Sequence, residues 1–318
     1  MNTAGRLGIY GAGLVLVFGV AFAAAGALVP DSAVASWMER GGAGHDEQSA
    51  EAAGQKTDNG KEQGTDVSGV TIAASGYTIG VISAPGETGI EGELSFVVRG
   101  ADGEPVTSYE TAHGKQLHLI VVRSDGSRYR HVHPVLDAGT GTWSLPWTWD
   151  AAGTYRVYAD FTASGGLGVT LSRTVDVGGP FTPQPPTETR TTATVDGFDV
   201  SISGDLVAGA GSELTVDVTR DGVPVTALEP YLGAFGHLVA LREGDLAYLH
   251  VHAHGDEPEP GDVAGPEVVF TAQAPTAGRY LLYLDFQVDG KVHTAPFVLD
   301  ATPADPSSND TGDDHGGH

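Results

Sequence analysis

Hydrophobic and polar residues alternate along most of the chain between residues 69 and 301, and this period of two predicts β-strands rather than helices. Turn sequences such as Ala-Asp-Gly, Ser-Asp-Gly and Asp-Gly interrupt the alternation. Short strands separated by frequent turns are typical of antiparallel sandwiches. We therefore predict an all-β fold of the immunoglobulin-like kind, without the disulfide of that fold.

The alternating pattern occurs twice. ELSFVVRGADGEPVT starts at Glu93 and ELTVDVTRDGVPVT at Glu213, and GTYRVYADF at 153–161 corresponds to GRYLLYLDF at 278–286. Each copy has about the length of one sandwich domain. We predict two tandem antiparallel β-sandwich domains at 69–178 and 192–301, joined by a proline-rich linker at 179–191.

The first thirty residues differ from this pattern, because no charge occurs between Leu7 and Val29. A helix of that length rises about 34 Å, enough to cross a bilayer. Arg6 precedes it, so we predict a single-pass anchor at 1–30 with a cytoplasmic N-terminus and extracytoplasmic domains. The alternative is a signal sequence cleaved near Ala35, after which the protein is secreted.

Two further segments have too few large apolar side chains to form a core. Residues 31–68 are predicted to be a disordered tether, and residues 302–318 a disordered acidic tail that ends in Asp-Asp-His-Gly-Gly-His.

The amino-acid composition and the net charge exclude several kinds of site and disfavour one kind of partner. The chain has no cysteine, which excludes disulfides, iron–sulfur clusters and blue-copper sites. Its net charge of −25 repels nucleic acid, so no nucleic-acid partner is expected.

Histidine supplies the candidate chemistry, because a cluster of three recurs 119 residues later in the chain. A β-hairpin with Asp125-Gly126 as its two-residue loop pairs His118 with His133 and puts His131 on the same face. The second copy, with Gly244-Asp245 as its loop, gives the equivalent arrangement. Three imidazoles on one hairpin face are suited to a metal ion. The predicted ligands are His118, His131 and His133 in one copy and His237, His250 and His252 in the other.

A carboxylate also recurs, in the Tyr-x-x-Tyr-x-Asp-Phe segment of each copy. We expect Asp160 and Asp285 to hold an imidazole through its other N–H rather than to bind the ion directly. Unrepeated histidines are auxiliary candidates: His113, His254, His293, His315 and His318. Whether the two copies act separately or share one site across their interface is left open.

Imidazole and carboxylate ligands suit Cu(II), Zn(II) or Ni(II), and the Irving–Williams order favours Cu(II). Copper is often oxidised outside the cytoplasm, so we expect Cu(II) first and Zn(II) second. Binding or buffering of a divalent metal, with a metal transporter as a further partner, is the expected function. Two alternatives remain: an interaction module for envelope proteins with structural histidines, or a metal-dependent hydrolase. No catalytic motif specifies a reaction, so an enzyme is not expected.

The sequence resembles a group of actinobacterial exported or membrane-anchored heavy-metal-binding proteins. The resemblance rests on the hydrophobic N-terminal segment and on GKQLHLIVVRSDGSRYRHVHP and YLGAFGHLVALREGDLAYLHVHAHG. The Pro-Val-Thr and Gly-x-Tyr…Asp-Phe stretches look like the YtkA-like β-sandwich domain. The resemblance implies a membrane-associated role in copper or other heavy-metal handling. Such relatives tend to carry a histidine-rich tether, whereas the tether of this chain is mainly acidic and glycine-rich.

Overall fold

The computed structural model describes residues 69–249, 251–259 and 261–304, which lie within one compact unit, Glu62–His318. The predicted anchor and tether (1–68) and residues 305–318 of the tail lie outside the described residues. Within the described residues, no helix has the length and apolar character needed to cross a membrane. Thr302, assigned above to the tail, still hydrogen-bonds through its backbone N–H to the carbonyl of Leu206.

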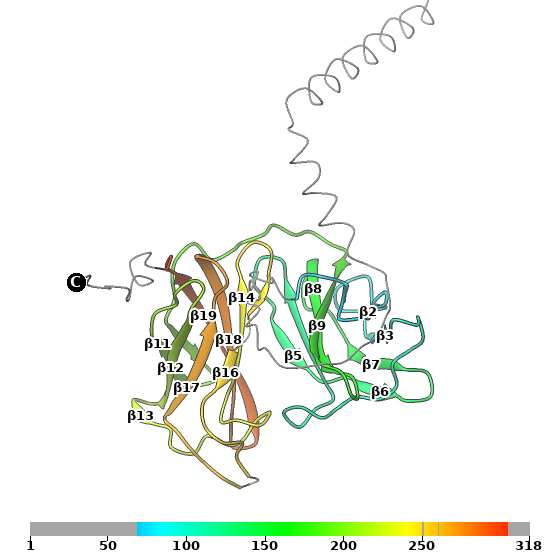
Figure 1. The fold of residues 1–318 in the computed structure, drawn as a ribbon. Helices are drawn as coiled ribbons and strands as arrows, with labels where there is room; N and C mark the ends of the chain where they lie inside the picture. Colours follow the sequence, from blue (N-terminus) through cyan, green and yellow to red (C-terminus); the bar gives the residue numbers. More distant parts are fainter. Residues whose placement is uncertain (1–68, 250, 260, 305–318) are drawn as a thin grey trace, which may run out of the picture. The chain divides into compact units, whose positions relative to one another are not determined.

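The all-β prediction is confirmed, since the described regular elements are antiparallel strands (Figure 1). In the first repeat, one sheet has the order β1 (Ala73–Ala74), β2 (Tyr77–Ile79), β3 (Gly92–Arg99), β7 (Thr142–Trp147) and β6 (Val135–Asp137). The other has the order β5 (Arg130–Val132), β4 (Leu117–Arg123), β8 (Gly153–Thr162) and β9 (Gly168–Val177). A core rich in aromatic side chains, including Trp143, Trp149 and Tyr155, fills the space between the two sheets and makes a β-sandwich.

The second repeat has the same organisation. Its first sheet has the order β10 (Thr192–Val195), β11 (Phe198–Ser203), β12 (Gly211–Arg220), β17 (Glu267–Gln273) and β16 (Val251–Ala253), with β13 (Val223–Pro224) also on β12. Its second sheet has the order β15 (Tyr248–Leu249), β14 (His237–Arg242), β18 (Gly278–Val288) and β19 (Lys291–Ala301). A separate core, with Phe198, Phe270 and Phe297 among its members, lies between these sheets.

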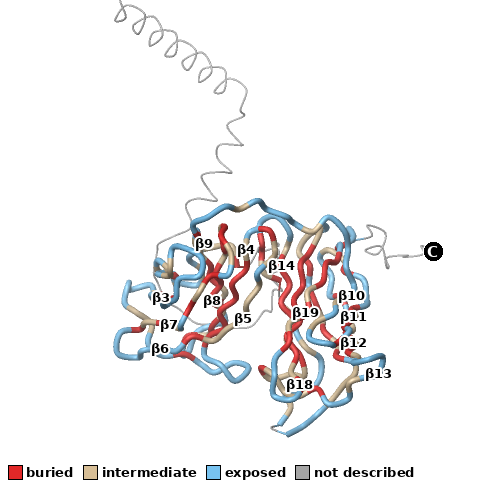
Figure 2. Tube along the Cα trace, turned by 180° about the vertical axis from the view of Figure 1, so that it is seen from behind, coloured by how far each residue is buried: buried red, intermediate tan, exposed pale blue. Residues whose placement is uncertain are grey.

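Four strands are buried on both faces, and Figure 2 shows long buried stretches along them. In β4 the side chains of Leu117, Leu119 and Val121 belong to the core of the first repeat. The alternate side chains of Ile120 and Val122 belong to a third apolar cluster, which also contains residues of the second repeat. The two sandwiches therefore pack against each other through the sheets that contain β4 and β14.

The third cluster combines residues of both repeats: Ile120, Val122, Tyr158, Val239, Leu241, Leu246, Leu281, Tyr283 and Val298. Two tyrosines cross it in opposite directions. The Tyr158 hydroxyl donates to the carbonyl of Leu246, and the Tyr283 hydroxyl donates to the carbonyl of Gly126. Because buried hydroxyls keep their partners, these bonds add directional contacts to an apolar interface.

The strand register that we predicted for the first histidine hairpin is confirmed. Leu119 pairs with Val132 and Ile120 with His131, and continuing this ladder by one residue puts His118 opposite His133. The predicted two-residue loop is wrong. The N–H of Gly126 bonds to the carbonyl of Arg123, and a left-handed residue, Arg128 with φ 57°, restores the register beyond the turn.

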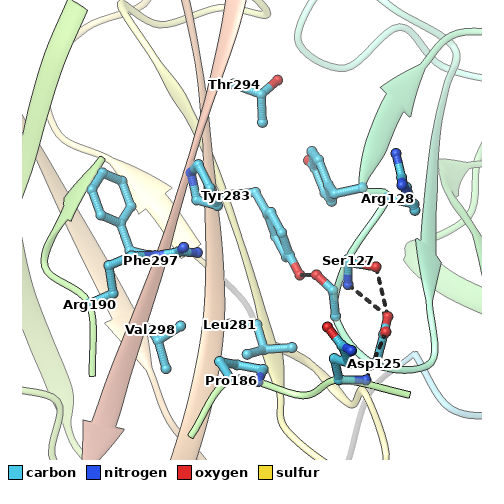
Figure 3. Close-up of a pocket in the computed structure, with 14 residues that line it drawn as sticks. Asp125, Ser127, Arg128, Pro186, Arg190, Leu281, Tyr283, Thr294, Phe297 and Val298 are labelled. Carbon is cyan, nitrogen blue, oxygen red and sulfur yellow. Dashed lines mark hydrogen bonds between the residues drawn. The ribbon is translucent and has the colours of Figure 1, made fainter. Parts of the chain in front are cut away.

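The carboxylate of Asp125 ties this turn to the linker between the repeats. It accepts two hydrogen bonds from the Arg123 guanidinium, two from Ser127 and one from the backbone N–H of Gln184. The turn, the linker and the Tyr283 ring border a pocket of about 590 Å³ (Figure 3). Burial by itself raises the pKa of the Asp125 carboxyl, but Arg123, Ser127 and Gln184 bring it down to about 2.

Replacement of Asp125 with asparagine should therefore change the pH dependence of stability. A depressed native pKa stabilises the fold above the unfolded pKa of about 3.9, and this contribution is lost as the pH falls through about 2. At pH 6 the wild type should exceed Asp125→Asn by about 2 kcal/mol in free energy of unfolding, and the difference should shrink between pH 4 and pH 2. Urea unfolding at a series of pH values measures this. A constant difference across that range would contradict the assignment.

Candidate metal centre

Histidine side chains from both repeats meet at one end of the third cluster. His118 lies on β4 two positions before Ile120, so it projects from the face that turns toward the second repeat. His237 has the same place on β14, two positions before Val239. Opposite them in register are Asp160 on β8 and Asp285 on β18. The two sandwiches thus bring two histidine–aspartate ladder pairs to one interface.

Three histidines of the first repeat form a compact group. One ligand nitrogen from each of His118, His131 and His133 lies within 4.8 Å of the others. The Nδ1 atom of His118 and the Nε2 atom of His131 are 3.1 Å apart. The His131 side chain is only 1% exposed, and that of Asp285 2%, so the group is shielded from water on this side.

Hydrogen bonds define the tautomers of the two closest rings. The Nε2 atom of His118 lies 3.2 Å from the carbonyl oxygen of Ala112, and a carbonyl only accepts, so this nitrogen carries the proton. The Nδ1 atom of His131 lies 2.9 Å from Oδ2 of Asp285, and it donates to that carboxylate. In neutral rings, the facing nitrogens are therefore His118 Nδ1 and His131 Nε2, both with a lone pair.

Two nitrogen atoms that lie 3.1 Å apart and both present a lone pair repel each other, unless a proton or a metal ion is shared between them. A proton is disfavoured, because burial lowers the pKa of His131 to about 3 and also lowers the pKa of His118. The third ring of the group is also neutral, because burial, together with His131 and His118, lowers the pKa of His133 to about 3. The arrangement is thus one of neutral imidazoles with their acceptor atoms turned toward one another.

Two buried ring nitrogens have no hydrogen-bond partner among the described residues, Nε2 of His133 and Nδ1 of His237. An unpaired buried polar atom costs about 1–3 kcal/mol, so such atoms require an explanation. Both belong to groups of potential ligands: His133 lies with His118 and His131, and His237 lies with His131 and Asp285. Cations held by these groups would give the two nitrogens partners.

Asp285 is the buried anion of the centre. Its Oδ2 atom accepts from His131 and from the Tyr129 hydroxyl, and its Oδ1 atom accepts from Thr294 at 2.5 Å. Burial raises the pKa of this carboxyl to about 6, while Thr294, His237 and Tyr129 act in the opposite direction. Asp285 thus holds an imidazole by its N–H, the role expected from the sequence, but the imidazole belongs to the other repeat.

Among the described residues, the structure does not bring the histidines together as two separate groups, one in each repeat. His237 joins the histidines of the first repeat, and its ring centroid lies 4.8 Å from that of His131. His252 lies instead on β16, pairs with Thr271 in the opposite sheet, and is exposed. His250 lies outside the described residues. The described histidines of the centre therefore form one cluster with members from both repeats, as in the shared arrangement that the sequence left open.

The remaining candidates lie around or away from this cluster. His113 is exposed, with its ring centroid 6.2 Å from His118 and 6.5 Å from His237. Asp160 accepts a hydrogen bond from Thr170. His254 contacts Thr271 at 2.6 Å, and His293 contacts Asp196 at 2.8 Å, so neither belongs to the centre. His315 and His318 lie outside the described residues.

A pocket of about 470 Å³ reaches His237 and gives the centre a route to solvent. His113, His252 and His254 also line it, together with three acidic residues that the sequence analysis did not select, Asp256, Glu257 and Glu267. The sequence offered one indication of these residues. Asp256 and Glu257 follow soon after the second His-x-His, and Glu267 lies in β17, the strand that pairs with β16. Acidic groups at the mouth of such a pocket raise the local concentration of cations.

The donor set fits a divalent transition metal. Metal–nitrogen bonds of about 2.0–2.1 Å place two ligands of one ion about 2.9–3.3 Å apart for angles between square and tetrahedral values. The 3.1 Å between His118 and His131 falls in that range. Imidazole nitrogens with a carboxylate suit Cu(II) and Zn(II).

Three of the solved structures that match the chain are the following. Domains 4 and 5 of the S-layer protein SbsC match with 10% identity and a TM-score of 0.21, covering 67% of this chain and 82% of that one. Fibronectin(III)-like modules of Clostridium thermocellum CbhA match with 12% identity and a TM-score of 0.19, covering 76% and 100%. A putative membrane anchored protein from Corynebacterium diphtheriae matches with 10% identity and a TM-score of 0.22, covering 72% and 59%. At these scores the matches carry no functional information.

No curated protein matches the chain. One family matches it twice, at residues 72–179 and 193–303, which are the two sandwiches described above. The chain therefore belongs to the family described as "Domain of unknown function (DUF8832)".

Proposed function

We propose that this protein binds a divalent metal ion, Cu(II) in first place and Zn(II) in second, in one histidine centre between two tandem immunoglobulin-like domains. One observation carries the proposal: the acceptor nitrogens of two buried imidazoles face each other across 3.1 Å, and burial lowers the pKa of both rings, which disfavours a second proton on either. A metal ion removes the repulsion and also gives the Nε2 atom of His133 a partner.

The setting of the centre fits binding or buffering rather than catalysis. The His118 ring donates to the carbonyl of Ala112, and the His131 ring donates to the carboxylate of Asp285. In metal sites, hydrogen bonds of this kind fix the orientation of histidine ligands. As part of the same proposal, residues 1–30 anchor the domains outside the cytoplasm, where the protein buffers the ion or delivers it to a transporter. The resemblance to heavy-metal-binding exported proteins supports this part.

Metal binding by the purified full chain tests the proposal. To remove the tail as a source of ligands, His315 and His318 are replaced with alanine in every sample. We expect this background protein to retain Cu(II), and more weakly Zn(II), through desalting, because the ligand nitrogens are already oriented. The double variant His118→Ala/His133→Ala should lose at least one equivalent, measured by elemental analysis and calorimetric titration.

His254→Ala serves as the control, since His254 is exposed and hydrogen-bonded to Thr271 outside the centre. It should bind as the background protein does. A background protein that takes up neither Cu(II) nor Zn(II) would rule out the metal proposal and leave the interaction module as the better reading. Equal stoichiometry in the double variant would move the site elsewhere in the chain.

A further inference from the structure

The His131 ring lies between two different groups of ligands. On one side its Nε2 atom faces Nδ1 of His118, with His133 completing the group. On the other side its Nδ1 atom faces Oδ2 of Asp285, with His237 completing a second group within 4.8 Å. The two nitrogens of an imidazole point away from each other, so one ion cannot use both.

We propose that the centre holds two divalent ions bridged by the His131 imidazolate, the first bound by His118, His131 and His133 and the second by His131, His237 and Asp285. The proposal rests on the proposed metal function and deepens it by assigning a second site. Metal–nitrogen bonds of about 2.0–2.1 Å on the two nitrogens of one ring place such ions roughly 6 Å apart.

Two contacts support the second site independently of the first. The Nδ1 atom of His237 is buried and has no partner among the described residues, and the first site leaves it unpaired. The separation of 2.9 Å between His131 Nδ1 and Asp285 Oδ2 equals that of two ligands about 90° apart on one ion, with bonds of about 2.0–2.1 Å. The second group thus has an unpaired nitrogen that can bind an ion and a distance between two ligand atoms that fits one ion.

Charge and protons balance in this arrangement. When the second ion binds, the proton on His131 Nδ1 leaves for solvent, and the ring becomes an anion shared by the two metals. The Asp285 carboxylate exchanges the hydrogen bond from His131 for a bond to the ion, while Tyr129 and Thr294 continue to donate to it. Two buried anions, the imidazolate and the carboxylate, then offset part of the charge of the ions, as buried charges require.

The pocket described above provides access to the second site, because His237 lines it. Its other ligands are shielded from water, since the side chains of His131 and Asp285 are 1% and 2% exposed.

Metal stoichiometry and electron paramagnetic resonance of the Cu(II)-loaded full chain test the inference, again with His315 and His318 replaced by alanine. We expect two equivalents of Cu(II), with a signal smaller than the copper content because an imidazolate couples the two spins. His237→Ala should bind one equivalent, with a signal that accounts for all of it. Asp285→Asn should behave in the same way, and it serves as the second variant if His237→Ala fails to fold.

His252→Ala is the matched control, since His252 lines the same pocket but lies on the opposite sheet. It should retain two equivalents and the coupled signal. One equivalent in the background protein at saturating Cu(II), or two in His237→Ala, would overturn the bridged pair and leave a single-ion function intact. Absence of any bound Cu(II) in the background protein would overturn both.

Discussion

Replacement of Val239 with aspartate is expected to separate the two sandwiches and to weaken metal binding. Val239 is fully buried in the apolar cluster between the repeats, and its β14 neighbour on the same face is His237. An unpaired buried carboxylate costs several kcal/mol, and separation of the sheets is the route by which it regains water. Loss of the interface also removes Asp285 from His131. Urea unfolding and Cu(II) titration of the same preparation measure the two effects together.

Val223→Asp is the control, because Val223 is 64% exposed on β13 in the same repeat. Its free energy of unfolding should change by less than about 0.5 kcal/mol, and its Cu(II) affinity should stay at the wild-type value. If Val239→Asp bound Cu(II) with wild-type affinity, the centre would not depend on the interface. The histidines of the first repeat would then be sufficient by themselves.

The sequence predicted the all-β fold class and the proximity of His118, His131 and His133, because both depend on local pattern. Alternation gave the strands, and the ladder of β4 with β5 has the register deduced from the turn. The interface was missed, although a signal for it was present. LHLIVVR in β4 and YLLYLDF in β18 are apolar on both faces, and a continuous apolar run indicates a strand covered on both sides.

The sequence did not indicate where the two described histidines of the second group lie, His237 in the centre and His252 in the opposite sheet. In the first repeat, Pro134 lies between β5 and β6, and proline cannot donate to a ladder, so the strand crosses to the other sheet only after His133. The second repeat has Ala253 in place of that proline. There β16 (Val251–Ala253) pairs with β17, which takes His252 to the opposite sheet.

Replacement of His131 with alanine is expected to remove metal binding entirely, since its ring belongs to both ligand groups. Without metal, the variant should lose about 1–3 kcal/mol, because the buried Asp285 carboxylate loses a donor. The larger effect is on stabilisation by metal. An ion at 100 times its dissociation constant adds about 2.7 kcal/mol, which raises Tm by roughly 5–10 °C for a chain of this size. The variant should show no rise in Tm with Cu(II), as measured by calorimetry.

The control for His131→Ala must distinguish the loss of stability that follows removal of any buried histidine from the loss of a metal ligand. His293 is 5% exposed, and its Nδ1 atom contacts Asp196 at 2.8 Å, so it shares burial and an aspartate partner with His131 but not its place in the centre. His293→Ala should therefore lose stability without metal yet keep the full rise in Tm with Cu(II). A Cu(II)-dependent rise of wild-type size in His131→Ala would contradict the central role of this ring, because stabilisation would then come from ligands that do not include it.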